Sequence, residues 1–339
     1  MDDHDQGNSG IEVPEHILDK VQEIAEFYVQ RELEAHRKFK AGDSDTPSRW
    51  LDGFSDEEQA YIIENSGYNN HSEERRELRR KILQQAVAHI AGDIPERAML
   101  FYVGGPQGTG KKEIRSSFDK RIEEEQSQGI IRPFENDHLE TVFQKYKQAK
   151  SRLMGPDYDV FRAELPEYLA NKEEHGHDFA FALIRAEATG LGAAIKAWAE
   201  ELKAHVILEE LGDGLTDDWL SRNKVEEKEL IVVGTTADPV LAKDRLVERQ
   251  DSADEDVLAK QFSRFSEDDG YPKWANEAEL AVLVKTDDGT PHVIHAANYG
   301  RTLEEDPLPV STFNRYSEVS VQEMFTPKAP DAQIDGLEF

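Results

Sequence analysis

The residues best suited to do chemistry lie in a glycine-rich stretch, Gly104–Gly110, and in the lysines that follow it. Gly105, Gly110 and Lys111 fit the G-x-x-x-x-G-K pattern of phosphate-binding loops. Glycines let the backbone curl so that successive N–H groups face a phosphate, and the positive end of the next helix adds to that field. Lys111 would then reach the β- and γ-phosphates of a nucleotide, ATP or GTP. The predicted nucleotide-binding residues are Gly105, Pro106, Gln107, Gly108, Thr109, Gly110, Lys111 and Lys112.

One position departs from the usual pattern. After Gly-Lys a Ser or Thr normally supplies the hydroxyl that holds Mg²⁺, and here the residue is Lys112. An ammonium group cannot ligate a cation. Either carboxylates elsewhere hold Mg²⁺, or a hydroxyl of Thr109, Ser116 or Ser117 substitutes, or the site binds nucleotide poorly. A glycine-rich turn without a ligand is the remaining alternative.

The elements that must position this loop can be predicted from apolar runs. Met99–Val103 is short, β-rich and bounded by glycine, which predicts a buried strand before the loop, and a helix to about Gln128 is expected after it. Further strands are expected at 130–134, 205–208, 230–234 and in a closing pair, 280–285 and 292–296, which flanks an Asp-Asp-Gly turn. Long helical patterns lie between them. This alternation predicts an α/β fold, a parallel sheet flanked by helices, with the P-loop after its first strand; the resemblance given below implies that this sheet is kinase-like.

Ligands of such sheets bind at the carboxyl ends of the strands. The phosphate loop, Asp137, Glu209 and Thr235 all follow predicted strands. Their common position at this edge is the strongest physical indication of an active site in the sequence. Asp137 can instead be the N-cap of the helix that starts at His138, a common role of aspartate.

The first part of the chain is predicted to be helical. Helices are expected at 13–39, at 55–65, where Ser55 and Glu58 form a capping box, and at 73–91. The arginines at the start of the third helix are interpreted as a solvated face that pairs with nearby glutamates, with an anion site as the alternative; they are Arg75, Arg76, Arg79 and Arg80. The predicted organisation is a disordered segment 1–12, an N-terminal helical region 13–92, a P-loop kinase-like domain 93–302 and an acidic, proline-containing tail 303–339.

Composition excludes several classes of function. The chain has 339 residues with 70 Asp and Glu against 40 Lys and Arg, a net charge of −30. Such a charge disfavours binding to nucleic acid and to anionic membranes. The absence of cysteine excludes disulfides, zinc thiolates and thiol nucleophiles. No apolar run is long enough to span a bilayer, and the polar first residues lack the apolar core of a signal peptide. A soluble, cytoplasmic protein is expected, with receptor-read secretion as an effector left open.

A family resemblance comes from the stretch Asp159–Tyr168, DVFRAELPEY. It resembles the D-x-F-R-x-x-x-P-x-Y motif of zeta-toxin-type kinases, whose phosphate loop is similar to GGPQGTGK here. The later strand HVIL ends in Glu209 and Glu210, where that family has an E-G-T motif. The stretch LIVVGTTADPVLAKDRLVER resembles the family's strand, small-residue turn and arginine-bearing helix. The resemblance spans about residues 98–300. Lys112, the missing E-G-T glycine and a longer interval from Lys111 to Asp159 depart from the family.

The resemblance implies ATP- and Mg²⁺-dependent phosphorylation of a hydroxyl on UDP-N-acetylglucosamine, or on NAD as in effector kinases of this fold. It implies an aspartate as the base. Asp159 has the better motif, whereas Asp137 follows the second predicted strand, where the family's aspartate lies. Arg245 and Arg249 are the implied phosphate clamps, for which surface ion pairs are the alternative, as they are for Arg162. The implied substrate contacts are Arg162, Glu209 and Glu210, and the candidate Mg²⁺ ligands are Asp137 and Glu209. For Asp159 too, a helix cap is the alternative.

Three functions therefore compete. The first is a kinase that acts on a small nucleotide-type metabolite. The second is a pseudokinase, a nucleotide-binding module without turnover, which Lys112 favours. The third is a P-loop ATPase or helicase, which the negative charge and the lack of basic, aromatic-interleaved segments disfavour. An antitoxin partner, or inhibition in cis by the N-terminal helices, is a further hypothesis from the resemblance.

Overall fold

The computed structural model describes residues 11–43, 48, 50–88, 90–129, 133–210, 220–221, 223, 225–249, 255–266, 270–287, 291–298 and 301–302. They belong to two compact units. The first draws on residues 1–102, 142–208 and 224–230, and the second on 103–141, 209–223 and 231–339. The predicted tail 303–339 and most of the predicted disordered segment 1–12 lie outside the described residues. The domain boundaries expected from the sequence stay a prediction.

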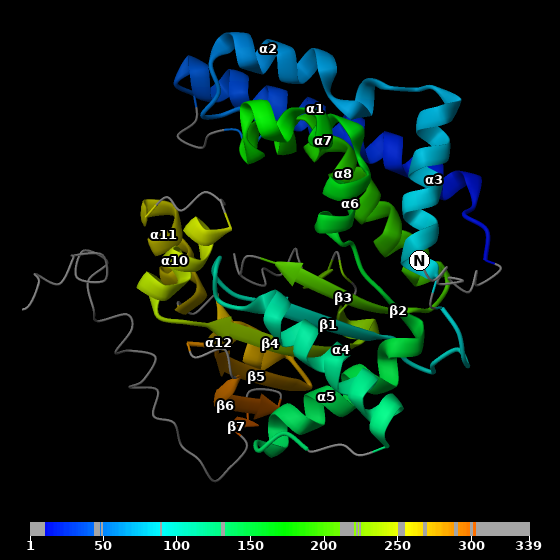
Figure 1. Ribbon diagram of the computed structural model, residues 1–339, viewed down its shortest axis with the longest axis vertical. Helices are drawn as coiled ribbons and strands as arrows, with labels where there is room; N and C mark the ends of the chain where they lie inside the picture. The colour runs from blue at the N-terminus through cyan, green and yellow to red at the C-terminus, as the bar shows by residue number, and fades with distance from the viewer. Residues whose placement is uncertain are drawn as a thin grey trace, which may run out of the picture. The chain divides into compact units, whose positions relative to one another are not determined.

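Within the described residues the strands form one sheet in the order β2-β3-β1-β4-β5-β6-β7 (Figure 1). β2 pairs with β3 and β4 pairs with β5 in parallel, whereas β6 is antiparallel to both β5 and β7. With helices between most of the strands, this mostly parallel arrangement confirms the predicted α/β class. The strands are β1 (Met99–Gly104), β2 (Leu153–Met154), β3 (His205–Glu210), β4 (Glu229–Thr236), β5 (Leu280–Lys285), β6 (His292–Asn298) and β7 (Arg301–Thr302).

Five of the six predicted strands are present. β1 is buried along its whole length, as its uninterrupted apolar run predicts. β5 and β6 form the expected antiparallel pair, with Lys285 opposite His292. The strand expected at 130–134 differs: residues 130–132 lie outside the described residues, and Pro133 and Phe134 are not in a strand. The short strand β2 that pairs with β3 starts only after α5 and a 3₁₀ turn, and its two apolar residues are too few to show a strand pattern.

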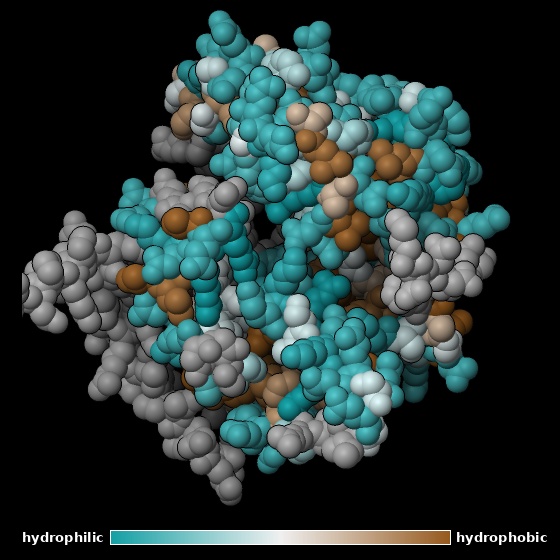
Figure 2. Space-filling view, viewed as in Figure 1, coloured by the Kyte–Doolittle hydropathy of each residue, from teal (hydrophilic) through white to brown (hydrophobic). Residues whose placement is uncertain are grey.

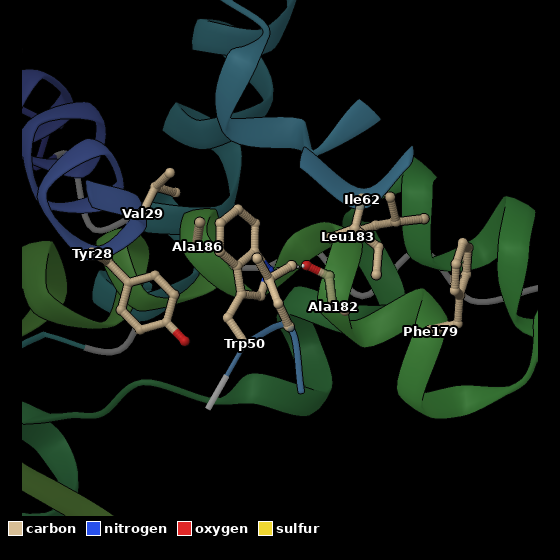
Figure 3. Close-up of a cluster of buried hydrophobic side chains, with 9 residues drawn as sticks. Tyr28, Val29, Trp50, Ile62, Phe179, Ala182, Leu183 and Ala186 are labelled. Carbon is tan, nitrogen blue, oxygen red and sulfur yellow. Dashed lines mark hydrogen bonds between the residues drawn. The ribbon is translucent and has the colours of Figure 1, made fainter. Parts of the chain in front are cut away.

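The first unit is mainly helical. A buried cluster joins α1, α2 and α8, with Trp50 at its centre and its indole N–H donating to Ala182 O at 2.8 Å (Figure 3). The predicted capping box is confirmed, because Ser55 Oγ accepts from Glu58 N and the Glu58 carboxylate accepts from Ser55 N. The helices here are α1 (Glu15–Ala41), α2 (Asp56–Asn65), α3 (Glu73–Val87), α6 (Tyr158–Glu164), α7 (Pro166–His175) and α8 (His177–Glu201), with 3₁₀ turns at Gly67–Asn69, Lys150–Arg152 and Val225–Glu227.

The interpretation of the α3 arginines as a solvated face is wrong for two of them. Arg75 and Arg79 are buried, and both donate to the carboxylate of Glu187, which is fully buried on α8. Arg75 also donates to Glu167 at 2.9 and 3.1 Å. Paired charges of this kind tolerate burial because each guanidinium N–H finds an acceptor. The ion pairs tie α3 to α7 and α8.

The second unit contains α4 (Lys111–Gln128), α10 (Pro239–Glu248), α11 (Glu255–Ser266) and α12 (Tyr271–Glu277), whereas α5 (Asp137–Ala149) begins in it and continues into the first unit. Ala242 and Leu246 of α10 pack against Leu258 and Phe262 of α11. In the part of the chain that the structure describes, no helix is both long and apolar enough to cross a membrane. The face drawn in Figure 2 is largely hydrophilic, as the charged content predicts.

Candidate functional site

The glycine-rich loop Gly105–Gly110 joins β1 to α4, as predicted, and lies in the second unit (Figure 1). Gly108 and Gly110 have φ angles of 74° and 87°, in the left-handed region that side chains disfavour. A Cβ on Gly108 would overlap the carbonyl oxygen of Ala242 on α10. The loop therefore needs glycine both for its backbone path and for its close approach to α10.

The lysine of the pattern folds onto the loop. Lys111 Nζ donates to the carbonyl oxygens of Gly105 and Pro106, each at 2.8 Å. The Thr109 hydroxyl, which is fully buried, donates to Pro106 O at 2.8 Å and is hydrogen-bonded to Thr235 Oγ1 at 2.8 Å. The ammonium group therefore lies at the N-terminus of α4. A bound phosphate would have to replace the two neutral carbonyl oxygens as its acceptors.

Burial lowers the pKa of Lys111 from its ordinary 10.5 to about 8. The carboxylates of Glu209 and Glu113 oppose this shift, whereas the charge of Arg249 adds to it. The lysine therefore remains mostly protonated at neutral pH and titrates in an accessible range. In the unfolded chain it would keep its proton to about pH 10.5, so this group makes stability rise with pH between about 8 and 10.5.

The affinity for ATP is expected to fall as the pH rises from about 7 to about 9, since the Lys111 ammonium loses its proton near pH 8. Isothermal titration calorimetry at several pH values measures this decline. In the Lys111→Arg variant the side chain stays protonated throughout, and the profile should flatten. An unaltered chain with the same affinity at pH 7 and pH 9 would contradict the lowered pKa.

Two glycines allow a matched test of the loop. Gly108→Ala should lower the free energy of unfolding by more than about 2 kcal/mol and abolish ATP binding, because the new Cβ meets both a positive φ and the Ala242 carbonyl. Gly129, at the C-terminus of α4, has a similar φ of 68° but open space around its Cβ position. Gly129→Ala should cost only about 1 kcal/mol and leave ATP binding intact. Urea unfolding and calorimetry measure both effects, and equal losses in the two variants would oppose a steric role of α10.

The loop is held from outside by polar side chains of neighbouring elements. Arg245 of α10 donates from Nη1 to Gly108 O and to Thr286 Oγ1, both at 3.1 Å, and from Nη2 to Thr286 O at 2.5 Å. Thr286, directly after β5, donates to Thr109 O at 2.9 Å. Gln261 of α11 accepts from Gln107 N at 2.9 Å. Arg245 was expected as a phosphate clamp, and the structure engages its guanidinium with the loop backbone instead.

Two carboxylates of the second unit interact electrostatically with the lysine. Glu209, at the end of β3, is half-buried and pairs with Arg115 of α4 at 3.2 Å. Glu113, in the first turn of α4, pairs with Arg249, and both side chains are exposed. Arg249 is therefore in a surface ion pair in this structure, as the alternative to a phosphate clamp expects. The neighbouring Glu210 is half-buried, and Lys112 is exposed at the start of α4.

The structure locates the two candidate bases on different helices. Asp137 is the exposed first residue of α5, and it is not the cap: Asn136 Oδ1 accepts from the N–H groups of His138 and Leu139, at 3.0 and 3.1 Å. The alternative of an N-cap role is therefore wrong by one residue. Asp137 is exposed on the second unit, and its proposed role as the base stays a prediction.

Asp159 lies in the first unit, in the first turn of α6. The cap of that helix is Asp157, whose Oδ1 accepts from the N–H groups of Asp159 and Val160. A capping role for Asp159 is therefore also wrong. Its carboxylate pairs instead with Arg162 one turn later, at 3.2 Å. This is an ion pair of the kind expected as the alternative to a substrate contact of Arg162.

The hydroxyls near the loop do not fit a protein-held Mg²⁺ ion. Thr109 is enclosed by its two hydrogen bonds, Ser117 donates to Ile114 O within its own helix, and Ser116 is exposed. Among the described residues, no group of three or more His, Cys, Asp or Glu side chains could hold a metal. Ligation of Mg²⁺ by Asp137 or Glu209 stays a prediction, and no chemical step is derived through the metal.

Sequence reasoning missed two partners of the loop, Thr286 and Gln261, and one partner of Glu209, Arg115. Thr286 had a signal, because it directly follows the predicted strand 280–285 at the same sheet edge as Thr235. Gln261 and Arg115 had none, since a polar residue on a helix gives no indication in the sequence of what it reaches across space. The loop lies between β1 and α4 as predicted, its role in nucleotide binding stays a prediction, and the residues that hold its shape come from α10, α11 and the end of β5.

Comparison with solved structures finds six similar chains, among them the following two. A chain of the crystal structure of AvrRxo1-ORF1:AvrRxo1-ORF2 with sulphate ions is 16% identical, with a TM-score of 0.48 over 81% of this chain and 78% of that chain. A chain of the PezAT chromosomal toxin-antitoxin system of Streptococcus pneumoniae is 11% identical, with a TM-score of 0.42 over 75% of this chain and 97% of that chain. No protein family and no curated protein matches the sequence. The roles proposed for residues of this chain rest on its own geometry.

Proposed function

We propose that the protein is an ATP-dependent kinase that phosphorylates a hydroxyl of a small nucleotide-type metabolite, such as UDP-N-acetylglucosamine or NAD. The observation that carries this proposal is the phosphate loop itself. Gly108 and Gly110 take the left-handed backbone that curls the loop between β1 and α4, and the half-buried Lys111 places its ammonium over the loop. A strand, such a loop and a helix N-terminus together favour binding of a polyphosphate.

In the proposed reaction the loop amides and Lys111 hold the β- and γ-phosphates. An aspartate, Asp137 or Asp159, takes the proton of the acceptor hydroxyl. The hydroxyl oxygen forms a bond to the γ-phosphorus while the bond from that phosphorus to the bridging β–γ oxygen breaks, and ADP leaves. Arg249 is the proposed phosphate clamp, which requires that it exchange its pair with Glu113 for phosphate oxygens. Arg162, Glu209 and Glu210 are proposed to contact the acceptor.

The test is turnover by the full chain. ATP or GTP is mixed with UDP-N-acetylglucosamine or with NAD, with and without Mg²⁺, and products are identified by mass spectrometry and ³¹P NMR. A phosphorylated acceptor and an equal amount of ADP are expected. Failure to bind ATP and GTP under both metal conditions would overturn the proposal. Asp137→Asn and Asp159→Asn then identify the base, because only the true base should lower kcat by about 100-fold or more.

A nucleotide-binding module without turnover is the second candidate. The observation that favours it is local: the position after Lys111 carries an exposed ammonium in Lys112, and the hydroxyl of Thr109 is already enclosed by other partners. Tight ATP binding with no product at any metal concentration would establish this function instead. A P-loop ATPase or helicase is disfavoured by the net charge of −30, and nucleic-acid-stimulated ATP hydrolysis would revive it.

Regulation by an antitoxin or by the N-terminal helices is also proposed. α1 and α2 share a buried core with α8, so removal of residues before 94 would expose the apolar face of α8. A truncated chain is therefore a poor test of inhibition in cis. The intact chain, assayed before and after addition of a candidate antitoxin, measures whether a partner suppresses turnover.

A further inference from the structure

The carbonyl groups of the phosphate loop have defined partners. Gly105 O and Pro106 O accept from Lys111, and Gly110 O accepts from Ile114 N as the first bond of α4. Two more carbonyls, those of Gly108 and Thr109, accept from side chains outside the loop. The donors are Arg245 on α10 and Thr286 after β5, both in the second unit.

The direction of these two carbonyls fixes the direction of two N–H groups. In a planar trans peptide, the C=O of one residue and the N–H of the next point in opposite directions. The Gly108 carbonyl points to the Arg245 guanidinium, so the Thr109 N–H points away from it. The Thr109 carbonyl points to the Thr286 hydroxyl, so the Gly110 N–H points away from Thr286. A flip of either peptide would present a carbonyl oxygen to an incoming phosphate and repel it.

We propose that Arg245 and Thr286 are positioning residues that hold the Thr109 and Gly110 amides in the orientation that binds a phosphate. This inference rests on the proposed function, because it assigns a role within the same phosphate site. It assigns Arg245 to the loop backbone and leaves Arg249 as the other of the two proposed phosphate clamps. The Arg245 guanidinium donates three hydrogen bonds to Gly108 O and Thr286. If it turned to contact a phosphate, the loop would lose these hydrogen bonds.

Burial makes this support energetically significant. Thr109 is fully buried and Thr286 is 3% exposed, so water has little access to replace the hydroxyl that Thr109 O accepts from. A buried carbonyl left without a donor carries a desolvation penalty, and rotation of the peptide is one way to relieve it. The Thr286 hydroxyl is also the acceptor for Arg245 Nη1, so its removal weakens both contacts together.

The test uses a matched pair of substitutions at one position. Thr286→Val removes the hydroxyl with little change of shape, and Thr286→Ser keeps the hydroxyl. The probe is inorganic pyrophosphate, measured by calorimetry, followed by the KM for ATP and the kcat. Thr286→Val should raise the Kd for pyrophosphate and the KM for ATP about tenfold while kcat changes little, and Thr286→Ser should restore both. The Gly110 amide resonance should shift on addition of pyrophosphate in the unaltered chain and shift less in Thr286→Val.

Controls separate positioning from general damage. Thr189→Val removes a hydroxyl that donates to Arg185 O on α8, in the first unit, and should leave pyrophosphate binding unchanged. Arg245→Lys keeps the charge but loses the two-pronged contact, and should weaken pyrophosphate binding as Thr286→Val does; it decides the question if Thr286→Val does not fold. Unaltered affinity in folded Thr286→Val or Arg245→Lys would overturn the inference. Pyrophosphate binding without phosphoryl transfer in the unaltered chain would overturn the kinase proposal alone, and failure of that chain to bind pyrophosphate or ATP would overturn both.

Discussion

Lys111→Met is expected to weaken ATP binding and to lower phosphoryl transfer by about 100-fold or more. The substitution removes the ammonium that lies 2.8 Å from two loop carbonyls and keeps an apolar stem of similar length. A charged donor in a partly buried site contributes far more than one in water, because the surroundings screen it less. The electrostatic gain should be larger in the transition state, where charge on the transferred group must be stabilised. Calorimetry and the kcat/KM for ATP measure the two effects.

The control for this variant comes from the same helix. Lys120 is exposed on α4 and pairs loosely with Glu124 at 4.0 Å, far along the helix from the loop. Lys120→Met removes the same charge and should change ATP affinity by no more than about twofold. If both variants bind ATP equally well, the loop does not bind phosphate through Lys111, and the proposed function loses its central contact. Because the net charge is −30, loss of any cation could weaken anion binding at long range, and Lys120→Met measures that contribution.

Local patterns were enough to predict the frame of the site. The buried strand at 99–103, the loop and the helix after it have signals within some thirty residues, and the capping box at Ser55 and Glu58 depends on a spacing of three. β3, β4 and β5 were also predicted from local sequence, because buried parallel strands have continuous apolar runs. The edge strand β2 was missed because it has only two residues and its sequence is bounded by polar residues.

What the sequence left out depends on contacts between distant residues. Among these arginines only Arg76 and Arg80 have a glutamate three positions away, and the surface interpretation was extended from them to Arg75 and Arg79, which have none at three or four positions. Their partner Glu187 lies more than a hundred residues later, within an alanine-rich helix that gives no indication of a buried charge. Arg245 is similar: its helix was predicted, and its contact with Gly108 O depends on how α10 packs on the loop. Residue type indicates what a side chain can do, and tertiary packing decides what it reaches.

Glu187→Gln is expected to lower the free energy of unfolding by about 3–5 kcal/mol, a large part of the stability of an ordinary domain. Glu187 is fully buried and accepts from Arg75 and from Arg79 Nε, the latter at 2.6 Å. Glutamine preserves the shape but replaces a carboxylate oxygen by an NH₂ donor that faces guanidinium N–H groups. Glu167, which contacts only Arg75 in this group, would be left to balance two buried cations. Urea unfolding followed by circular dichroism measures the loss.

Glu77→Gln is the matched control, because it makes the same chemical change in an exposed pair. Glu77 accepts from Arg80 one turn later on α3, and its side chain is 65% exposed. Water replaces the lost contact there, so the free energy of unfolding should change by less than about 0.5 kcal/mol. A Glu187→Gln protein as stable as Glu77→Gln would mean that α3 is held to α8 by apolar packing alone. The expected difference between the two variants instead makes the buried ion pairs the main polar link between α3 and α8.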